Sequence, residues 1–232
     1  MSVVLLPSPL LPSSAYTGLL EALAGAAPTT DGARPAVLAD PSGPTTGGEL
    51  VERWSAVARD LRPDLIVAHS NAGYLAPAVR ARAAPGAVVV HVDAALPPAG
   101  RRRAALAPAG FRDFAASLAD DTGLLPPWTD WWPRATLEAL VPGEVLPALE
   151  RDCPRVPLGY LDSTVDVPDG WAAEPTAYLA FGDTYADEVA FAGAQGWPLL
   201  TREGGHLQFL WTPDRVAADV LALERRSRVA PR

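Results

Sequence analysis

The sequence predicts an α/β fold with a mostly parallel central sheet and flanking helices. Short apolar runs alternate with helical patterns along the 232 residues, and this alternation is typical of parallel βαβ units. The runs are almost continuously apolar, as expected for strands covered by helices on both faces. The connections between them are short, which also favours such units.

The elements follow in order along the chain. Four strands are expected in the first part: Val3–Leu6, Ala36–Ala39, Leu65–Ala68 and Val88–Val92. The helices expected between them are Tyr16–Ala24, Gly48–Leu61 and Asn71–Ala84. Later strands are expected at Pro157–Leu161, Ala177–Phe181 and Trp197–Thr201. The last two helices are expected at Tyr185–Gln195 and Pro213–Arg225.

The middle of the chain has a different character. Residues 95–153 lack strand-like apolar runs and read as two or three helices broken by prolines. We therefore expect one sheet domain, made of residues 1–94 and 154–232, with a helical cap inserted at residues 95–153.

Composition excludes several classes of protein. A hydrophobic content of 49% with 20% charged residues is typical of a globular protein, and no apolar run approaches the roughly 20 residues of a membrane span. The net charge of −8 argues against nucleic acid as a partner. One cysteine and no basic segment before the first apolar run favour a cytoplasmic protein. Lysine is absent, which excludes Schiff-base chemistry, and composition leaves the oligomeric state open.

The segment from Ala68 to Gly73 carries the main functional signal. Ser70 follows an apolar strand, precedes a helical pattern and has alanine at minus two and plus two. This is the context of a nucleophile elbow, whose sharp turn tolerates only small flanking residues. Glycine usually occupies both flanks. The same pattern also fits a Ser-Asn cap on an ordinary βα loop.

A nucleophilic serine needs a histidine as base and a carboxylate to orient that histidine. Of the three histidines, His69 lies beside the serine on the turn, and His91 lies in an apolar strand typical of a core position. His206 follows two glycines after the last strand, where a base on a βα loop is expected. His206 is therefore the predicted base.

Four aspartates are candidates for the acid. Asp183 is favoured because it ends a strand and precedes His206 by enough residues for one helix and one strand. Asp93 ends the strand after the elbow and is the next choice. Asp187 would lie one helical turn beyond Asp183, and Asp162 is the weakest alternative.

These residues resemble those of the α/β-hydrolase superfamily. The resemblance covers most of the chain, namely Val3–Leu20, Leu65–Ala84, Val88–Pro97 and Ala177–Leu223. It implies an eight-stranded sheet, a helical cap over the active site and a triad of Ser70, Asp183 and His206. It specifies no particular reaction.

One loop departs from the superfamily pattern. Where a His-Gly pair often follows the first strand, this chain reads Pro7-Ser8-Pro9-Leu10. Proline has no N–H to donate, so the first oxyanion donor is expected to be Leu10, with the Ser8 amide or the hydroxyls of residues 13 and 14 as alternatives. Asn71, which follows the nucleophile, is expected to supply the second donor.

The predicted cap carries an aromatic, proline-rich patch. Its members Trp128, Trp131 and Trp132 are expected to favour an apolar small-molecule substrate, with His69 and Tyr74 at the pocket rim. We therefore expect a serine hydrolase that cleaves an ester or thioester and needs no cofactor or metal. The alternatives are a lyase or cyclase of natural-product biosynthesis that uses His206 and Ser70 for proton transfer, and a non-catalytic binding protein on the same scaffold.

Overall fold

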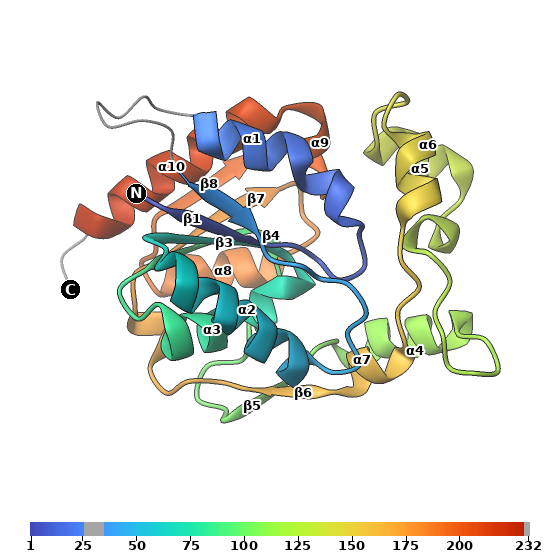
Figure 1. Ribbon diagram of the computed structural model, residues 1–232, viewed down its shortest axis with the longest axis horizontal. Helices are drawn as coiled ribbons and strands as arrows, with labels where there is room; N and C mark the ends of the chain where they lie inside the picture. Colours follow the sequence, from blue (N-terminus) through green and yellow to red (C-terminus); the bar gives the residue numbers. More distant parts are fainter. Residues whose placement is uncertain (26–34, 230–232) are drawn as a thin grey trace.

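A parallel sheet of six strands forms the centre of the computed structural model, which describes residues 1–25 and 35–229 (Figure 1). The strand order is β2-β1-β3-β4-β7-β8, and every neighbouring pair is parallel. The strands are β1 (Val3–Leu6), β2 (Ala36–Leu38), β3 (Leu65–Ser70), β4 (Val88–Ala94), β7 (Thr176–Phe181) and β8 (Leu199–Arg202). A separate antiparallel pair joins β5 (Arg103–Ala105) to β6 (Thr164–Asp166).

Helices cover both faces of the sheet (Figure 1). One face carries α1 (Thr17–Gly25), α9 (Gln208–Trp211) and α10 (Pro213–Val229). The other carries α2 (Gly47–Leu61), α3 (Ala76–Ala83) and α8 (Ala186–Ala194). The remaining helices are α4 (Ala109–Leu118), α5 (Arg134–Leu140), α6 (Leu146–Asp152) and α7 (Leu158–Asp162), with 3-10 turns η1 (Ser13–Tyr16), η2 (Asn71–Tyr74), η3 (Trp128–Trp131) and η4 (Trp171–Ala173).

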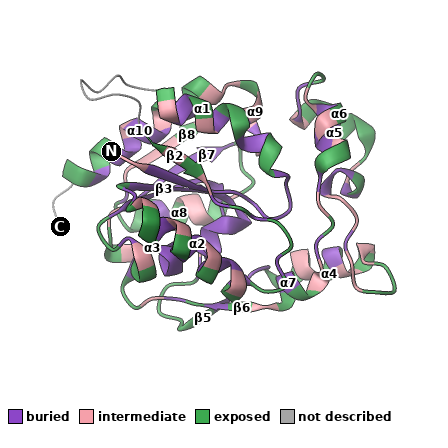
Figure 2. Cartoon of the chain, in the orientation of Figure 1, coloured by how far each residue is buried: buried purple, intermediate pink, exposed green. Residues whose placement is uncertain are grey.

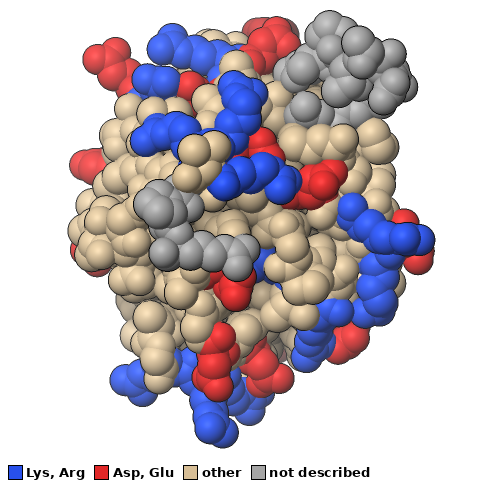
Figure 3. Space-filling model, turned by 90° about the vertical axis from the view of Figure 1, so that its left-hand side faces the viewer, with Lys and Arg blue, Asp and Glu red and all other residues tan. Residues whose placement is uncertain are grey.

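The four inner strands are buried along their whole length (Figure 2). Their continuous apolar runs fit this position, because helices shield both faces of a parallel sheet. The surface in Figure 3 carries basic and acidic side chains interspersed, without an extended patch of one sign. Within the described ranges, no helix is long and apolar enough to cross a bilayer.

The predicted fold class is confirmed, and most predicted strands and helices lie where the sequence indicated. The expectation of a strand at Pro157–Leu161 is wrong, because this run forms α7 outside the central sheet. Pro157 is the N-cap of this helix, with φ −66°, and a short apolar run does not by itself distinguish strand from helix. The eight strands implied by the resemblance are also not found: the described residues contribute six to the central sheet.

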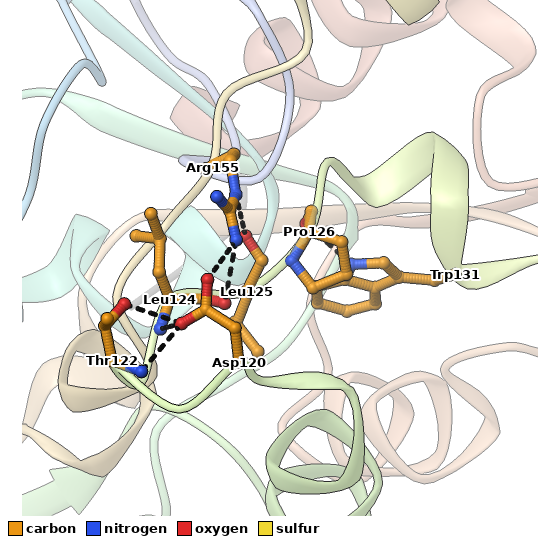
Figure 4. A network of polar contacts seen from close by, with 7 residues as sticks. All are labelled: Asp120, Thr122, Leu124, Leu125, Pro126, Trp131 and Arg155. Carbon is orange, nitrogen blue, oxygen red and sulfur yellow. Dashed lines mark hydrogen bonds and ion pairs between the residues drawn. The ribbon is translucent and has the colours of Figure 1, made fainter.

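The segment from residue 95 to 153 holds α4, α5 and α6 and also β5, so it is not wholly helical. In Figure 1 these three helices stand beyond the carboxyl ends of the central strands. A network of hydrogen bonds links Asp120 of this segment to Arg155, just after its end (Figure 4). The Asp120 carboxylate accepts hydrogen bonds from Thr122 and from the Leu124 amide, and Arg155 pairs with its other oxygen at 2.5 Å. These bonds lower the pKa of Asp120 well below its usual range.

Candidate active site

Ser70 occupies a strained turn at the end of β3. Its backbone angles are φ 58° and ψ −130°, a region that non-glycine residues avoid at a cost of roughly 1–3 kcal/mol. Ala68 and Ala72 are completely buried on either side. The tightest position is Gly73, where an added Cβ would lie 2.0 Å from the Ala95 carbonyl oxygen. Glycine at plus three therefore allows the turn to pack against the chain that follows β4.

Ser70 and His206 are brought together by two loops at the carboxyl edge of the sheet. The Oγ atom of Ser70 lies 3.1 Å from Nε2 of His206, and Nδ1 of His206 lies 2.8 Å from Oδ2 of Asp93. A carboxylate only accepts hydrogen bonds, so Nδ1 carries the ring proton and Nε2 faces the serine hydroxyl as an acceptor. This arrangement can remove a proton from Ser70.

Asp93 is held in place at both ends. Its Oδ1 atom accepts a hydrogen bond from the Phe181 amide at 2.9 Å, which leaves Oδ2 for His206. Its own backbone adopts a left-handed conformation with φ 42°, which aspartate tolerates better than most residues. The Tyr178 hydroxyl fixes the next residue, since it donates to the Ala94 carbonyl at 2.6 Å and accepts from the Ala94 amide at 3.0 Å.

The preference for Asp183 as the partner of His206 is therefore corrected. Asp183 lies exposed in the turn before α8, and Asp93 occupies the place at Nδ1 of His206. Asp187 is exposed in the first turn of α8. Asp162 ends α7 and forms a two-point ion pair with Arg112. At the end of β4 the backbone of Asp93 is left-handed, and its carboxylate contacts His206 and the Phe181 amide.

Two residues that line the same cavity as Ser70, Asn71 and Leu10, carry backbone amides that are candidate oxyanion donors. The Asn71 N–H opens η2, a position where no carbonyl of the same helix can accept it. The Asn71 side chain is held by the Leu106 carbonyl and by the Tyr160 hydroxyl, each at 2.6 Å. The Ser8 amide already donates to Tyr16, whereas the Leu10 amide has only a long 3.4 Å contact with the Ser8 hydroxyl.

The hydroxyl alternatives from the same loop do not reach the site. Residues 13 and 14 are both exposed, and the Ser14 hydroxyl contacts Asp152. Leu10 and Asn71 thus remain the two candidate oxyanion donors.

A cavity of about 430 Å³ opens beside Ser70 and His206. Its apolar wall includes Leu10, Leu106, Pro108, Phe111, Trp128 and Trp132. Tyr74 also lines it, and burial raises the pKa of this phenol to about 12. Three of the predicted lining residues, Tyr74, Trp128 and Trp132, are therefore at the cavity.

Two predicted lining residues are elsewhere. Trp131 packs against Phe111 and Phe114, and its indole N–H donates to the Pro126 carbonyl (Figure 4). His69 is completely buried beneath the site, with its ring nitrogens bonded to Tyr16 and to the His206 carbonyl. Around η3, Trp128 and Trp132 line the cavity whereas Trp131 does not, and on β3 the side chains of His69 and Ser70 point to opposite faces.

The sequence did not indicate the polar side of the cavity, which is contributed by the start of α8. Tyr185, Asp187 and Glu188 lie there. Burial raises the pKa of Glu188, and the neighbouring Asp187 charge acts in the same direction. Burial also raises the pKa of Tyr185, while a hydrogen bond with the Ser70 side chain acts in the opposite direction. The sequence offered one signal for these residues: they lie at the start of the helix that follows β7, and the carboxyl end of β7 is at the site.

His91, the third histidine, is a buried core residue, as its position in an apolar strand predicted. It packs between Tyr178 and Trp197, and burial lowers its pKa to about 3. In residues 1–25 and 35–229, no group of three or more His, Cys, Asp or Glu side chains is arranged to hold a metal ion.

No protein-family model matches the sequence, and no curated protein matches it. Solved structures are similar throughout the chain. A pyrethroid hydrolase superposes with a TM-score of 0.70 at 14% identity, covering 99% of both chains. The fold is that of the α/β-hydrolases.

Two further structures share the α/β-hydrolase fold. An enzyme that recognises and cleaves the ring of the Pseudomonas quinolone signal has a TM-score of 0.62 at 17% identity, covering 97% of this chain and 92% of that one. A proline iminopeptidase-related protein from Thermus thermophilus has a TM-score of 0.51 at 17% identity, covering 97% and 91%. At these identities the likeness establishes the fold.

Proposed function

We propose that the protein is a serine hydrolase that cleaves a carboxylic ester or thioester of a mainly apolar small molecule. The observation that carries the proposal is the continuous chain of contacts from Ser70 Oγ to His206 and on to Asp93, at 3.1 and 2.8 Å. The cavity beside it supplies space for an acyl or alkyl group. The α/β-hydrolase fold of the chain supports the same reaction class.

The proposed reaction assigns a role to each of these residues. His206 removes the proton from Ser70 as its Oγ attacks the carbonyl, and Asp93 keeps the ring in the required tautomer and stabilises its cation. His206 then protonates the leaving group, and later activates the water that releases the acyl group. The amides of Asn71 and Leu10 serve as donors to the oxyanion; loss of one such donor typically costs about 10²–10³-fold in rate.

The cavity wall indicates the substrate class. The aromatic and aliphatic wall favours an apolar group, since burial of apolar surface contributes about 25 cal/mol per Å². Carboxyl groups of Asp187 and Glu188 on the other side disfavour an anionic substrate. Residues 95–153, which supply Leu106, Trp128 and Trp132, act as the cap over this cavity.

A fluorophosphonate probe tests the proposal. The wild type is expected to be labelled once per chain and to hydrolyse p-nitrophenyl butyrate, and Ser70→Ala is expected to abolish both. Ser13→Ala changes an exposed serine outside the cavity and is the matched control. A wild type that is neither labelled nor active on acetate, butyrate and thioester substrates would refute the hydrolase assignment.

A lyase or cyclase is the second candidate, and the loop after β1 favours it. Pro7 and Pro9 have no amide to donate, and the Ser8 amide is bonded to Tyr16, so the Leu10 amide is the remaining backbone donor of residues 7–10 within reach of the cavity. Proton transfer by His206 needs no oxyanion stabilised by this loop. If activity on a natural-product intermediate is retained in Ser70→Ala but lost in His206→Ala, the result would support this candidate over the hydrolase.

A further inference from the structure

A buried chain of hydrogen bonds runs beneath Ser70 and joins two loops of the site. The Ser8 amide donates to the Tyr16 hydroxyl at 2.8 Å, and that hydroxyl lies 2.8 Å from Nδ1 of His69. On the other side of the ring, Nε2 of His69 lies 3.1 Å from the carbonyl oxygen of His206. Tyr16 and His69 are completely buried, and Ser8 is nearly so.

The partners determine the direction of each bond. A carbonyl oxygen only accepts, so Nε2 of His69 must carry a proton and donate to His206. In the neutral ring, Nδ1 is then an acceptor, and the Tyr16 hydroxyl donates to it while accepting from Ser8. Burial lowers the pKa of His69 well below its usual value, and the nearby His206 acts in the same direction. His69 is thus a neutral ring with every polar atom paired.

The two ends of this hydrogen-bond chain lie in two loops of the site. Ser8 belongs to the loop that carries the Leu10 amide, and the His206 carbonyl belongs to the loop of the base. That second loop, which follows β8, contains Gly205 and Gly204, whose φ of 134° lies in the region that favours glycine. Two glycines give the backbone freedom, and the hydrogen bond from His69 holds the carbonyl of His206 itself.

Ring packing adds to this attachment. The His69 ring stacks on the His206 ring with centroids 4.7 Å apart, and Phe209 packs edge-on against His69 at 4.9 Å. Phe209 also stacks on Tyr16 at 5.0 Å. Because His69 stays neutral, it places no positive charge beside the His206 cation that forms when Ser70 is deprotonated.

We propose that His69 is a positioning residue for His206, and that Tyr16 couples this position to the loop carrying the Leu10 amide. The role rests on the proposed function, because it concerns the base of that reaction. His69 acts on the backbone and ring of His206 and touches no substrate, since it lies outside the residues that line the cavity.

Two amide substitutions separate positioning from packing. A glutamine at residue 69 places its amide near the former Nε2, where it can donate to the His206 carbonyl, whereas an asparagine places it near Nδ1, where it can bond only Tyr16. We expect His69→Asn to lower kcat by about 10²-fold with KM little changed, because small misplacements of a catalytic group have costs of this size. His69→Gln is expected to recover most of that loss.

The matched control is His91→Asn, which removes another fully buried histidine ring on the neighbouring strand. It is expected to lower the thermal unfolding temperature without the loss of kcat. Tyr16→Phe tests the coupling: it is expected to lower kcat while leaving His69 bonded to His206. Each assay is run below the unfolding temperature of the variant, so that folded enzyme is compared with folded enzyme.

A spectroscopic measurement keeps the positioning role separate from the proposed function. Histidine ¹⁵N NMR at pH 7 is expected to show His69 protonated at Nε2 only, and a downfield Nδ1 proton on His206 that persists in His69→Gln and disappears in His69→Asn. Persistence of that proton and of kcat in His69→Asn would overturn the positioning role. Loss of the proton in His69→Asn, together with a wild type that is neither labelled by fluorophosphonate nor active on the ester and thioester substrates, would uphold positioning and refute only the hydrolase.

Discussion

His206 and Asp93 lie 113 positions apart in the chain, yet Nδ1 of the histidine is 2.8 Å from Oδ2 of the aspartate. The other carboxylate oxygen accepts the Phe181 amide, so both oxygens of Asp93 are engaged. The contact is almost fully enclosed, since the Asp93 side chain is 1% exposed. A buried carboxylate held by two bonds orients the imidazole more rigidly than an exposed one on a turn.

Substitution of the aspartates tests this relationship. Asp93→Asn is expected to lower kcat/KM for p-nitrophenyl butyrate by about 10⁴-fold, because the amide favours the wrong imidazole tautomer. Asp183→Asn is the matched control and is expected to leave kcat/KM unchanged, since Asp183 is exposed in a turn. Full activity of Asp93→Asn would show that the histidine is oriented by another group.

Gly73 is expected to be indispensable for the turn that holds Ser70. In Gly73→Ala the new Cβ would meet the Ala95 carbonyl oxygen at 2.0 Å, and overpacking of this kind costs about 1–3 kcal/mol. Urea unfolding should show the loss of stability, and esterase activity should fall with it. Gly86→Ala, where an added Cβ meets nothing within 4 Å, is the control. Equal unfolding midpoints for the two variants would contradict the close approach.

Acid stability is expected to depend on the buried histidines. The pKa of His91 is lowered to about 3 by burial, whereas a histidine in the unfolded chain titrates near 6.5. Below pH 6.5 the unfolded chain therefore binds a proton that the folded protein refuses, and the free energy of unfolding falls as the pH falls towards 3. The slope is about 1.4 kcal/mol per pH unit for one such group.

His91→Leu removes this proton uptake. Neither nitrogen of His91 has a hydrogen-bond partner in the part of the chain that the structure describes, so an apolar side chain loses no bond. Urea unfolding at pH 7, 6 and 5 should show a shallower loss of stability than in the wild type. His69, whose pKa is also lowered by burial, continues to contribute to the slope. Parallel curves for variant and wild type would mean that His91 is accessible to protons in the folded state.

Trp131 and Trp132 are expected to differ in their contribution to substrate binding. Trp132→Ala should raise KM for a p-nitrophenyl octanoate by about tenfold, because a buried aromatic contributes at least 1.5 kcal/mol to an apolar contact. KM for the acetate should change little. Trp131→Ala is expected to lower the unfolding temperature without this chain-length effect, since Trp131 packs within the segment of residues 95–153. If the acyl-chain length of the substrate changed KM equally in both variants, the assignment of Trp132, and not Trp131, to the cavity wall would be contradicted.

Local sequence determined the sheet and the serine turn. The apolar runs of β1, β3, β4 and β7 have few alternatives to burial in a parallel sheet, and the small residues around Ser70 allow one sharp turn. The Gly-Gly-His sequence placed His206 on a loop after the last strand. These features depend on neighbours in the chain, so the fold class and two of the three contacting residues could be predicted.

Tertiary structure alone decided the partner of His206, the lining of the cavity and the fate of the run at residues 157–161. Asp93 lies near the end of β4, whereas Asp183 lies in the turn after β7. The backbone at Asp93 is left-handed, Tyr178 holds the next residue and the Phe181 amide holds the carboxylate, so that this carboxylate lies at the imidazole. The side chain of Trp131 turns away because Pro126 accepts its N–H. Such contacts join residues that are distant or oriented by packing, and a pattern read along the chain carries no information about them.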